Sequence, residues 1–244
     1  MLEIALYDLL ATAAICAALA GLAYWRDLLT LAGSAGAFAM GLVIGVFGGV
    51  EWVLVLLVFL VSSFAATRYG FEAKRAMGQQ EGRRGERGLV NVAANGFVAC
   101  LAAAAYPWVG EPAAVLFLVA VASAASDTLA SELGVLSPNA YLITNGRRVA
   151  PGTNGGVSLG GTAWALVAAA YVSLVGAAFL GWAGAMAWTP LNVALPVLAG
   201  FLGCNVDSVL GATLETRGYL TKLTNNLASI ALATALAAVV MFLA

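Results

Sequence analysis

Four carboxylates with the potential for chemistry stand near the ends of long apolar runs. Asp127 and Glu132 lie in "SDTLASELG", and Asp207 and Glu215 lie in "NVDSVLGATLE". A charged side chain inside a membrane costs about 2.5 to 3.5 kcal/mol even on the lenient insertion scale, so these acids need a reason to be there. Oxygen ligands in a chain without histidine favour Mg²⁺, which commonly bridges a few carboxylates to substrate phosphates. We expect Asp127, Asp207 and Glu215 to bind Mg²⁺, and Asp127, Glu132 and Asp207 to act in catalysis.

Helical spacing limits which of these acids can share one ion. Asp207 and Glu215 are eight residues apart and therefore form one stripe on a helix. Asp127 and Glu132 are five residues apart, which is about 140° around an ideal helix, so they converge only if the helix breaks near Gly134. The alternative interpretation is that each acid caps or hydrogen-bonds a helix end.

A glycine-rich stretch, "PGTNGGVSLGGT" at residues 151–162, follows a pair of arginines. Backbone N–H groups of such a loop and of a helix N-terminus bind anions, and arginines add bidentate phosphate contacts. The stretch is not a Walker A loop, because no Gly-Lys-Ser/Thr follows. A re-entrant hinge is the competing interpretation. We expect this loop to bind phosphates through Arg147, Arg148, Gly152, Thr153, Asn154, Gly155, Gly156 and Ser158.

Other polar residues complete the candidate phosphate site. Asn91 and Asn95 are four residues apart and share one helix face. Asn225 begins the last apolar run, and Lys74 lies in the long polar segment "RYGFEAKRAMGQQEGRRGERG" at residues 68–88. That segment is either a solvated loop that fixes topology and contacts anionic lipid, or a lid facing the phosphates. We include these four residues among the phosphate-binding candidates.

The elements that must position these residues are membrane helices. The chain has 244 residues, of which 62% are hydrophobic and 9% charged, whereas a soluble domain carries about a quarter charged residues. A membrane-spanning helix needs about 20 apolar residues. Eight runs approach this length: 4–24, 28–47, 52–66, 89–106, 113–130, 159–180, 191–210 and 227–243. We expect one all-α domain over residues 1–244, a polytopic transmembrane bundle of about eight helices with short cytoplasmic loops. The net charge of −1 gives no reason to expect nucleic acid.

The basic residues predict the orientation of this bundle. All eleven fall in odd-numbered connections: Arg26, then Arg68 to Arg87, then Arg147 and Arg148, then Arg217 and Lys222. The even-numbered connections contain no Lys or Arg and are rich in tryptophan. Because Lys and Arg remain on the cytoplasmic side, we expect external termini and an active site on the cytoplasmic side of the cell membrane.

Several segments together resemble a known family. "TRYGFEAK", "ASDTLASELG", "ITNGRRVAPGTNGGVSLGGT" and "DSVLGATLE" followed by "TNN" resemble the integral-membrane family that includes plant phytyl-phosphate kinase. The layout is also similar to that of CTP-dependent dolichol and polyprenol kinases. The resemblance implies transfer of a phosphoryl group from a nucleoside triphosphate, with CTP as the expected donor, to a prenyl monophosphate, giving a prenyl diphosphate. Polyprenol kinases usually have a lysine where this chain has arginines, which leaves the nucleotide open.

Two other classes of function remain. One is a polyprenol kinase or a lipid cytidylyltransferase. The other is an ion-coupled transporter, which also uses intramembrane acids and glycine-broken helices but places them near the midplane of the bilayer. The excess of basic residues around the glycine-rich loop favours an acceptor that carries its own phosphate, and hence a prenyl phosphate over a prenol.

Overall fold

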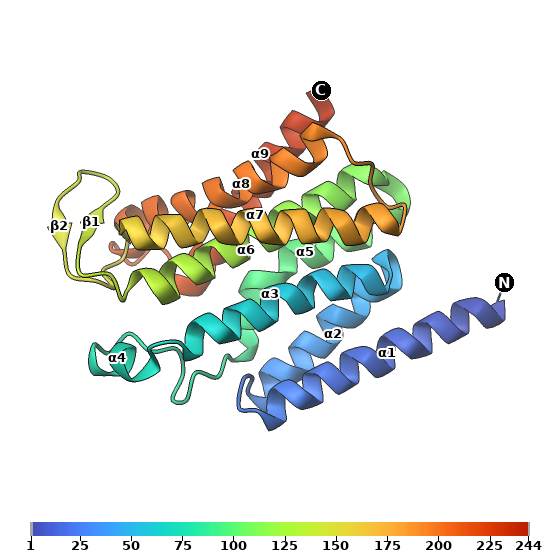
Figure 1. Cartoon of the computed structure of the whole chain (residues 1–244), viewed down its shortest axis with the longest axis horizontal. Coiled ribbons are helices and arrows are strands. Elements are labelled where there is room, and N and C mark those ends of the chain that lie inside the picture. The colour runs from blue at the N-terminus through green and yellow to red at the C-terminus, as the bar shows by residue number, and fades with distance from the viewer. Residues whose placement is uncertain (1, 244) are drawn as a thin grey trace.

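The computed structural model describes residues 2–243 and shows a bundle of long helices (Figure 1). The helices are α1 (Leu2–Trp25), α2 (Leu31–Gly48), α3 (Val50–Arg68), α4 (Phe71–Ala76), α5 (Leu89–Val109), α6 (Glu111–Gly134), α7 (Leu159–Trp182), α8 (Pro190–Leu210) and α9 (Lys222–Leu243). A π-helical turn, Gly211–Glu215, extends α8. Each of the eight predicted apolar runs corresponds to one long helix, although α2 begins at Leu31, three residues after the predicted start of the second run. The predicted all-α membrane fold is therefore confirmed.

Seven of the described helices are long and apolar enough to cross a membrane: α2, α3, α5, α6, α7, α8 with its π-helical turn, and α9. Within α1, the residues whose side chains the structure describes form a shorter apolar helix, Leu9–Trp25. The third predicted run was too short at 52–66, because α3 extends over Val50–Arg68 and includes a charged residue at each end. Composition and length therefore predicted the helices better than their boundaries.

Helix α6 is the centre of the bundle. It packs against α3, α5, α7, α8 and α9. In its apolar stretch of 18 residues, which is long enough to cross a membrane, 83% of the residues are buried inside the protein. Small residues permit this close packing: a Cβ atom placed on Gly200 of α8 would lie 2.7 Å from the Cβ of Ala122 in α6. Helix α1, by contrast, packs mainly against α2 at the edge of the bundle (Figure 1). The central position of α6 explains why its polar residues face other helices and not lipid.

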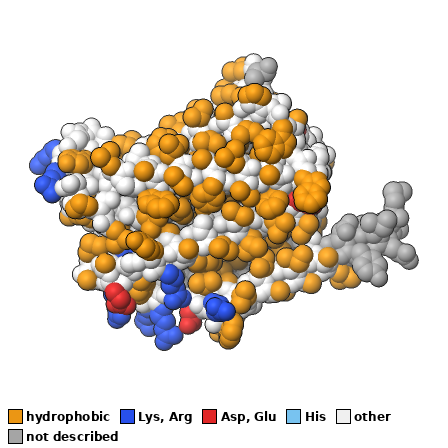
Figure 2. All heavy atoms as spheres, in the orientation of Figure 1, with side chains coloured by type: hydrophobic (Ala, Val, Ile, Leu, Met, Phe, Trp, Pro, Cys, Tyr) orange, Lys and Arg blue, Asp and Glu red, His pale blue; other side chains and the backbone are white. Residues whose placement is uncertain are grey.

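The two ends of the bundle differ in charge. The connections α1–α2, α3–α5, α6–α7 and α8–α9 lie at one end, which we call the basic end because all eleven Lys and Arg residues occur there (Figure 1). The opposite end holds Glu51, Glu111 and the exposed Trp108, Trp182 and Trp188. Figure 2 shows an apolar surface between the two ends, with basic side chains gathered at the basic end. This polarity matches the alternation of connections that the sequence predicts.

A small antiparallel sheet stands at the basic end between α6 and α7. Its strands are β1 (Ala140–Leu142), β2 (Arg148–Val149) and β3 (Gly156–Val157), in the order β2-β1-β3. The glycine-rich stretch joins β2 to β3, and the amide of Ile143 donates to the carbonyl of Gly155 at 3.0 Å. The loop is therefore held by a sheet and does not re-enter the bundle as a broken helix.

Candidate active site

A cavity of about 270 Å³ opens at the basic end, under the glycine-rich loop and between α5, α6, α7, α8 and α9. Most of its charged lining is acidic. The charged residues that line it are Glu81, Asp127, Glu132, Asp207, Glu215, Arg87 and Lys222. The four acids that the sequence singled out thus come to one place, although they belong to two different helices.

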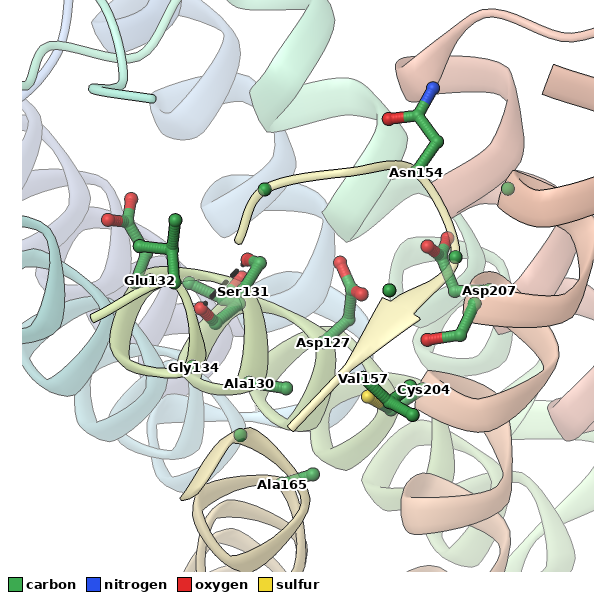
Figure 3. A pocket seen from close by; sticks show the side chains of 18 of the residues that line it. Asp127, Ala130, Ser131, Glu132, Gly134, Asn154, Val157, Ala165, Cys204 and Asp207 are labelled. Atoms are coloured by element: carbon green, nitrogen blue, oxygen red, sulfur yellow. Dashed lines mark hydrogen bonds between the residues drawn. The ribbon is translucent and has the colours of Figure 1, made fainter. Parts of the chain in front are cut away.

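Asp127 and Asp207 lie on facing walls of the cavity, in α6 and α8 (Figure 3). Both side chains are half-buried and lie in the third of their helices nearest the basic end. Asp207 Oδ2 accepts a hydrogen bond from Ser229 Oγ at 3.1 Å. Within the described residues, neither aspartate has a basic partner within 4.0 Å. Two partly buried carboxylates without cations are costly unless a bound cation or a proton compensates them.

The carboxylates that line the cavity are hard oxygen donors of the kind that Mg²⁺ prefers. In the part of the chain that the structure describes, no group of three or more His, Cys, Asp or Glu residues is placed to hold a metal ion by itself. Mg²⁺ is, however, usually held by one or two carboxylates together with substrate phosphates and water. Asp127 and Asp207 fit this open mode of binding, in which the substrate completes the coordination.

The glycine-rich loop closes directly onto the end of α8. Asn154 Nδ2 donates to Glu215 Oε1 at 3.0 Å. Gly155 has φ of +72°, and a Cβ atom there would lie 2.6 Å from the carbonyl oxygen of Ser208. The backbone can approach α8 this closely because glycine has no side chain. Glu215, predicted as a metal ligand, is thus also the residue that fastens the loop.

Ser158 joins the two helices that flank the sheet. Its Oγ accepts the amide of Gly161 at 3.0 Å, which caps α7, and donates to the carbonyl of Gly134 at 3.2 Å, which ties the end of α6. The N-termini of α5, α7 and α9 and the C-termini of α6 and α8 meet at the basic end (Figure 1). Helix N-termini favour anions, and C-termini favour cations. The electrostatic field of these helix ends therefore suits both an anionic phosphate and a metal cation near the cavity.

Several predicted phosphate ligands lie away from the cavity. Arg147 and Arg148 are exposed on the β1–β2 hairpin and do not line it; Arg148 donates to Asn139 Oδ1 at 2.6 Å. Asn225 is buried behind Asp207 and donates to that residue's backbone oxygen at 3.0 Å. The β1–β2 hairpin directs both arginines away from the cavity. Their position next to the glycine-rich stretch in the sequence does not predict this direction.

Asn91 and Asn95 do line the cavity, as do Gly152, Thr153 and Gly156. Asn91 Nδ2 donates to Glu81 Oε1 at 3.2 Å, and Asn95 Nδ2 donates to the Asn91 backbone oxygen at 2.9 Å. The shared helix face predicted from their spacing is therefore directed at the cavity. Asn95 Oδ1 is buried without a partner among the described residues.

Lys74 and Glu132 form a buried network beside the cavity. Lys74 is 0% exposed, and its Nζ donates to Glu132 Oε2 at 2.7 Å and to the backbone oxygens of Ala66 and Thr67 at 2.8 Å each. Thr67 Oγ1 donates to Glu132 Oε1 at 2.8 Å. All three ammonium protons and both carboxylate oxygens are thus engaged. Lys74 does not line the cavity, and Glu132 has less freedom than Asp127 to accept a metal.

Helix α6 continues unbroken to Gly134, so the helix break that would bring Asp127 and Glu132 to one ion does not occur before that residue. The two carboxyl groups point in different directions (Figure 3). Their separation of about 140° around the helix is the physical reason. Asp207, on a neighbouring helix, is the acid that faces Asp127.

The sequence interpretation did not select Arg87, Lys222, Glu81 or Gln79, all of which line the cavity. Arg87 belongs to the polar segment at residues 68–88, for which a solvated loop and a phosphate-facing lid are both open interpretations, yet it is 6% exposed. Burial lowers the pKa of Arg87, and the carboxylates of Glu132, Glu81 and Asp127 counteract that effect. The available signal was position: Arg87 lies two residues before α5, near in sequence to Asn91, which also lines the cavity.

Comparison with known proteins places the chain in a family. The model of the integral membrane protein family DUF92 matches residues 14–239, which is most of the chain. The chain belongs to this family. The match confirms the resemblance to the phytyl-phosphate kinase-like membrane proteins and includes every residue that lines the cavity.

The family relatives are distributed widely. The chain is 32% identical to an uncharacterized membrane protein of Methanocaldococcus jannaschii over 77% of this chain and 75% of that protein. It is 31% identical to Protein VTE6, chloroplastic, of Arabidopsis thaliana over 83% of this chain and 61% of that protein. It is 32% identical to Protein PGR of Arabidopsis thaliana over 80% of this chain and 75% of that protein. No solved structure matches the chain.

Proposed function

We propose that this protein is a membrane-embedded kinase that transfers a phosphoryl group from a nucleoside triphosphate to a prenyl monophosphate, giving a prenyl diphosphate. The observation that carries the proposal is the pair Asp127 and Asp207, which face one cavity without a basic partner beneath a glycine-rich loop. The resemblance to the family that includes plant phytyl-phosphate kinase supports the same reaction. CTP is the donor that we propose.

The charge of the cavity supports a metal-dependent reaction. Five carboxylates and two basic side chains line it, and Lys74 behind the wall balances one of these carboxylates, Glu132. A nucleoside triphosphate is strongly anionic, so it enters such a site only together with cations. Mg²⁺ held by Asp127 and Asp207 would neutralise charge and polarise the phosphoryl oxygens.

The reaction needs positioning more than acid–base chemistry. An ionised oxygen of the acceptor phosphate attacks the γ-phosphorus, the bond to the bridging β–γ oxygen breaks, and the nucleoside diphosphate leaves with that electron pair. The glycine-rich loop would hold the donor phosphates through its backbone amides. A prenol acceptor would also have to lose a proton, for which Asp127 or Asp207 is the available base.

The depth of the charges favours an enzyme over a carrier. Asp127 and Asp207 lie toward the basic end, and α6 is continuous over its whole length. Ion-coupled carriers place their sites near the midplane on discontinuous helices. We propose that the basic end is cytoplasmic, with the nucleotide entering from the cytosol and the prenyl chain lying between helices.

The direct test uses purified protein in detergent with Mg²⁺ and CTP. Geranylgeranyl phosphate and geranylgeraniol are offered in parallel, and CDP and the lipid products are quantified. We expect the phosphate to react at least about tenfold faster, since one charge-assisted phosphate contact contributes about 1.5 to 3 kcal/mol. Because Arg147 and Arg148 do not line the cavity, this expectation rests on Arg87 and Lys222.

Asp127→Asn and Asp207→Asn should each lower turnover by about 100-fold, or about 2.7 kcal/mol of transition-state stabilisation. Asp27→Asn is the matched control, because Asp27 is exposed at the same end and does not line the cavity.

In the comparison of substrates, faster reaction of the alcohol would favour a prenol kinase. Release of diphosphate with a CDP-lipid product from the lipid phosphate would indicate a cytidylyltransferase, and no turnover with any nucleotide would favour the transporter.

A further inference from the structure

Two backbone hydrogen bonds fix the position of Arg87 just before the N-terminus of α5. Its amide donates to the carbonyl of Leu28 at 3.0 Å, and its carbonyl accepts the amide of Thr30 at 3.0 Å. These bonds fasten the end of the polar segment to the α1–α2 connection. The backbone that carries Arg87 is therefore fixed on both sides, and its side chain is 7% exposed.

The guanidinium group is held mainly by one of its nitrogens. Nη2 donates to Thr67 Oγ1 at 3.1 Å and lies 3.8 Å from Glu132 Oε1. The ring centroid of Phe64 lies 5.8 Å from Cζ. The Nε group is buried and has no hydrogen-bond partner among the described residues. A buried donor without an acceptor is costly, so this N–H leaves the guanidinium with unused capacity to donate to a further acceptor.

The surrounding charges leave Arg87 available for such a ligand. Lys74 lies 2.7 Å from Glu132 and already balances its charge, while Arg87 lies farther away. These three residues together carry one net positive charge. Glu81 and Asp127 also act on Arg87 electrostatically, but neither carboxylate lies within 4.0 Å of its guanidinium. Because a guanidinium offers several coplanar N–H donors, it can keep its bond to Thr67 and still bind a phosphate oxygen.

We propose that Arg87 binds a phosphoryl group in the cavity, and that Thr67, Glu132 and Lys74 are positioning residues that hold its guanidinium in place. The role of Arg87 in a kinase reaction rests on the proposed function, whereas its binding of a phosphoryl group does not. The phosphoryl group belongs either to the nucleotide or to the lipid, and the experiment separates these two sources.

Binding is measured on the purified full chain in detergent, as the shift in thermal unfolding with ligand. One arm uses CTP with Mg²⁺, and the other uses geranylgeranyl phosphate, with geranylgeraniol as its phosphate-free control. We expect Arg87→Gln to weaken binding by about tenfold or more in at least one arm, and that arm identifies the source. Arg84→Gln, at an exposed arginine that pairs with Asp27, should bind as the wild type does. Wild-type affinity of Arg87→Gln for both ligands would overturn the proposal.

Further variants separate binding from folding. Arg87→Lys keeps the charge but loses the planar donors, so it should fold normally and bind less tightly than the wild type. Thr67→Val removes the hydroxyl that orients the guanidinium and should raise KM more than it lowers kcat, and Thr67→Ser should restore KM. Equal KM for Thr67→Val and wild type would contradict the positioning role.

The two proposals can fail separately. If the wild type turns over prenyl phosphate and Arg87→Gln has unchanged KM and kcat, the inference about Arg87 is wrong and the proposed kinase remains. If no prenyl substrate is turned over, but phosphate binding still depends on Arg87, the proposed kinase is wrong and the anion site remains.

Discussion

At the scale of single residues, the two acids of α6 that line the cavity have different surroundings. Glu132 is 8% exposed and saturated by Lys74 and Thr67, whereas Asp127 faces the cavity without a basic partner within 4.0 Å among the described residues. A buried ion pair contributes little net stability compared with apolar packing, but removing one partner leaves a charge uncompensated. Glu132 therefore supports the wall of the cavity, and Asp127 remains free for chemistry.

Lys74→Met should destabilise the protein by about 3 to 5 kcal/mol, with Arg87 keeping the loss near the lower value. The measurement is denaturant or thermal unfolding of the purified protein in detergent. Arg75→Met is the matched control: Arg75 is exposed and pairs with Glu72 at 4.0 Å, so its loss should cost less than about 1 kcal/mol. Equal stabilities of the two variants would show that the buried network does not hold the segment.

At the scale of elements, the glycine-rich loop gains its shape from its neighbours. The sheet β2-β1-β3 holds both ends of the loop, and Asn154 fastens its tip to Glu215 in the π-helical turn after α8. The loop therefore joins the α6–α7 half of the site to α8. A shift of either element would move the backbone amides relative to Asp207.

Gly155→Ala should weaken nucleotide binding by about tenfold, which corresponds to about 1.4 kcal/mol. A Cβ there meets the backbone of α8 and also strains a residue with φ of +72°. Gly146→Ala is the control, because Gly146 has φ of +68° in the same segment but open space around it. The measurement is the apparent KM for CTP, which should rise more for Gly155→Ala than for Gly146→Ala. An equal rise in both variants would point to backbone strain alone and would contradict the close packing of the loop onto α8.

At the scale of the whole molecule, charge is distributed along the axis of the bundle. All eleven Lys and Arg residues and the cavity lie at the basic end, while the exposed Trp108, Trp182 and Trp188 lie at the opposite end. Such an asymmetry orients a polytopic membrane protein. It also places the cavity at one end of the bundle, where the soluble donor and the lipid acceptor of the proposed reaction could meet.

Cysteine labelling of intact cells with a membrane-impermeant reagent tests this orientation. Ala183→Cys, in the α7–α8 connection, should be labelled from outside, and Ala76→Cys, at the end of α4, should react only after permeabilisation. Both alanines are exposed, and Cys16, Cys100 and Cys204 are buried, so the background should be low. Labelling of Ala76→Cys in intact cells would show that the basic end is external and would contradict the predicted orientation.

The sequence by itself determined the helices and the polarity of the bundle. Apolar runs of about 20 residues must form helices in a membrane because the backbone has to satisfy its own hydrogen bonds there. The position of the basic residues in alternate connections likewise follows from counting along the chain. Asp127, Asp207 and the loop at residues 152–156 were selected for the same reason, since polar groups in an apolar chain are conspicuous.

Only the tertiary structure decided which of these polar groups meet. Lys74 and Glu132 are 58 residues apart and pair because α4 folds back against α6. Arg148, close in sequence to the loop, is turned outward by the hairpin, whereas Arg87 reaches the cavity from a distant segment. Spacing along one helix determines a shared face, but contacts between helices depend on packing around α6, which is set by small residues and not by the charges themselves.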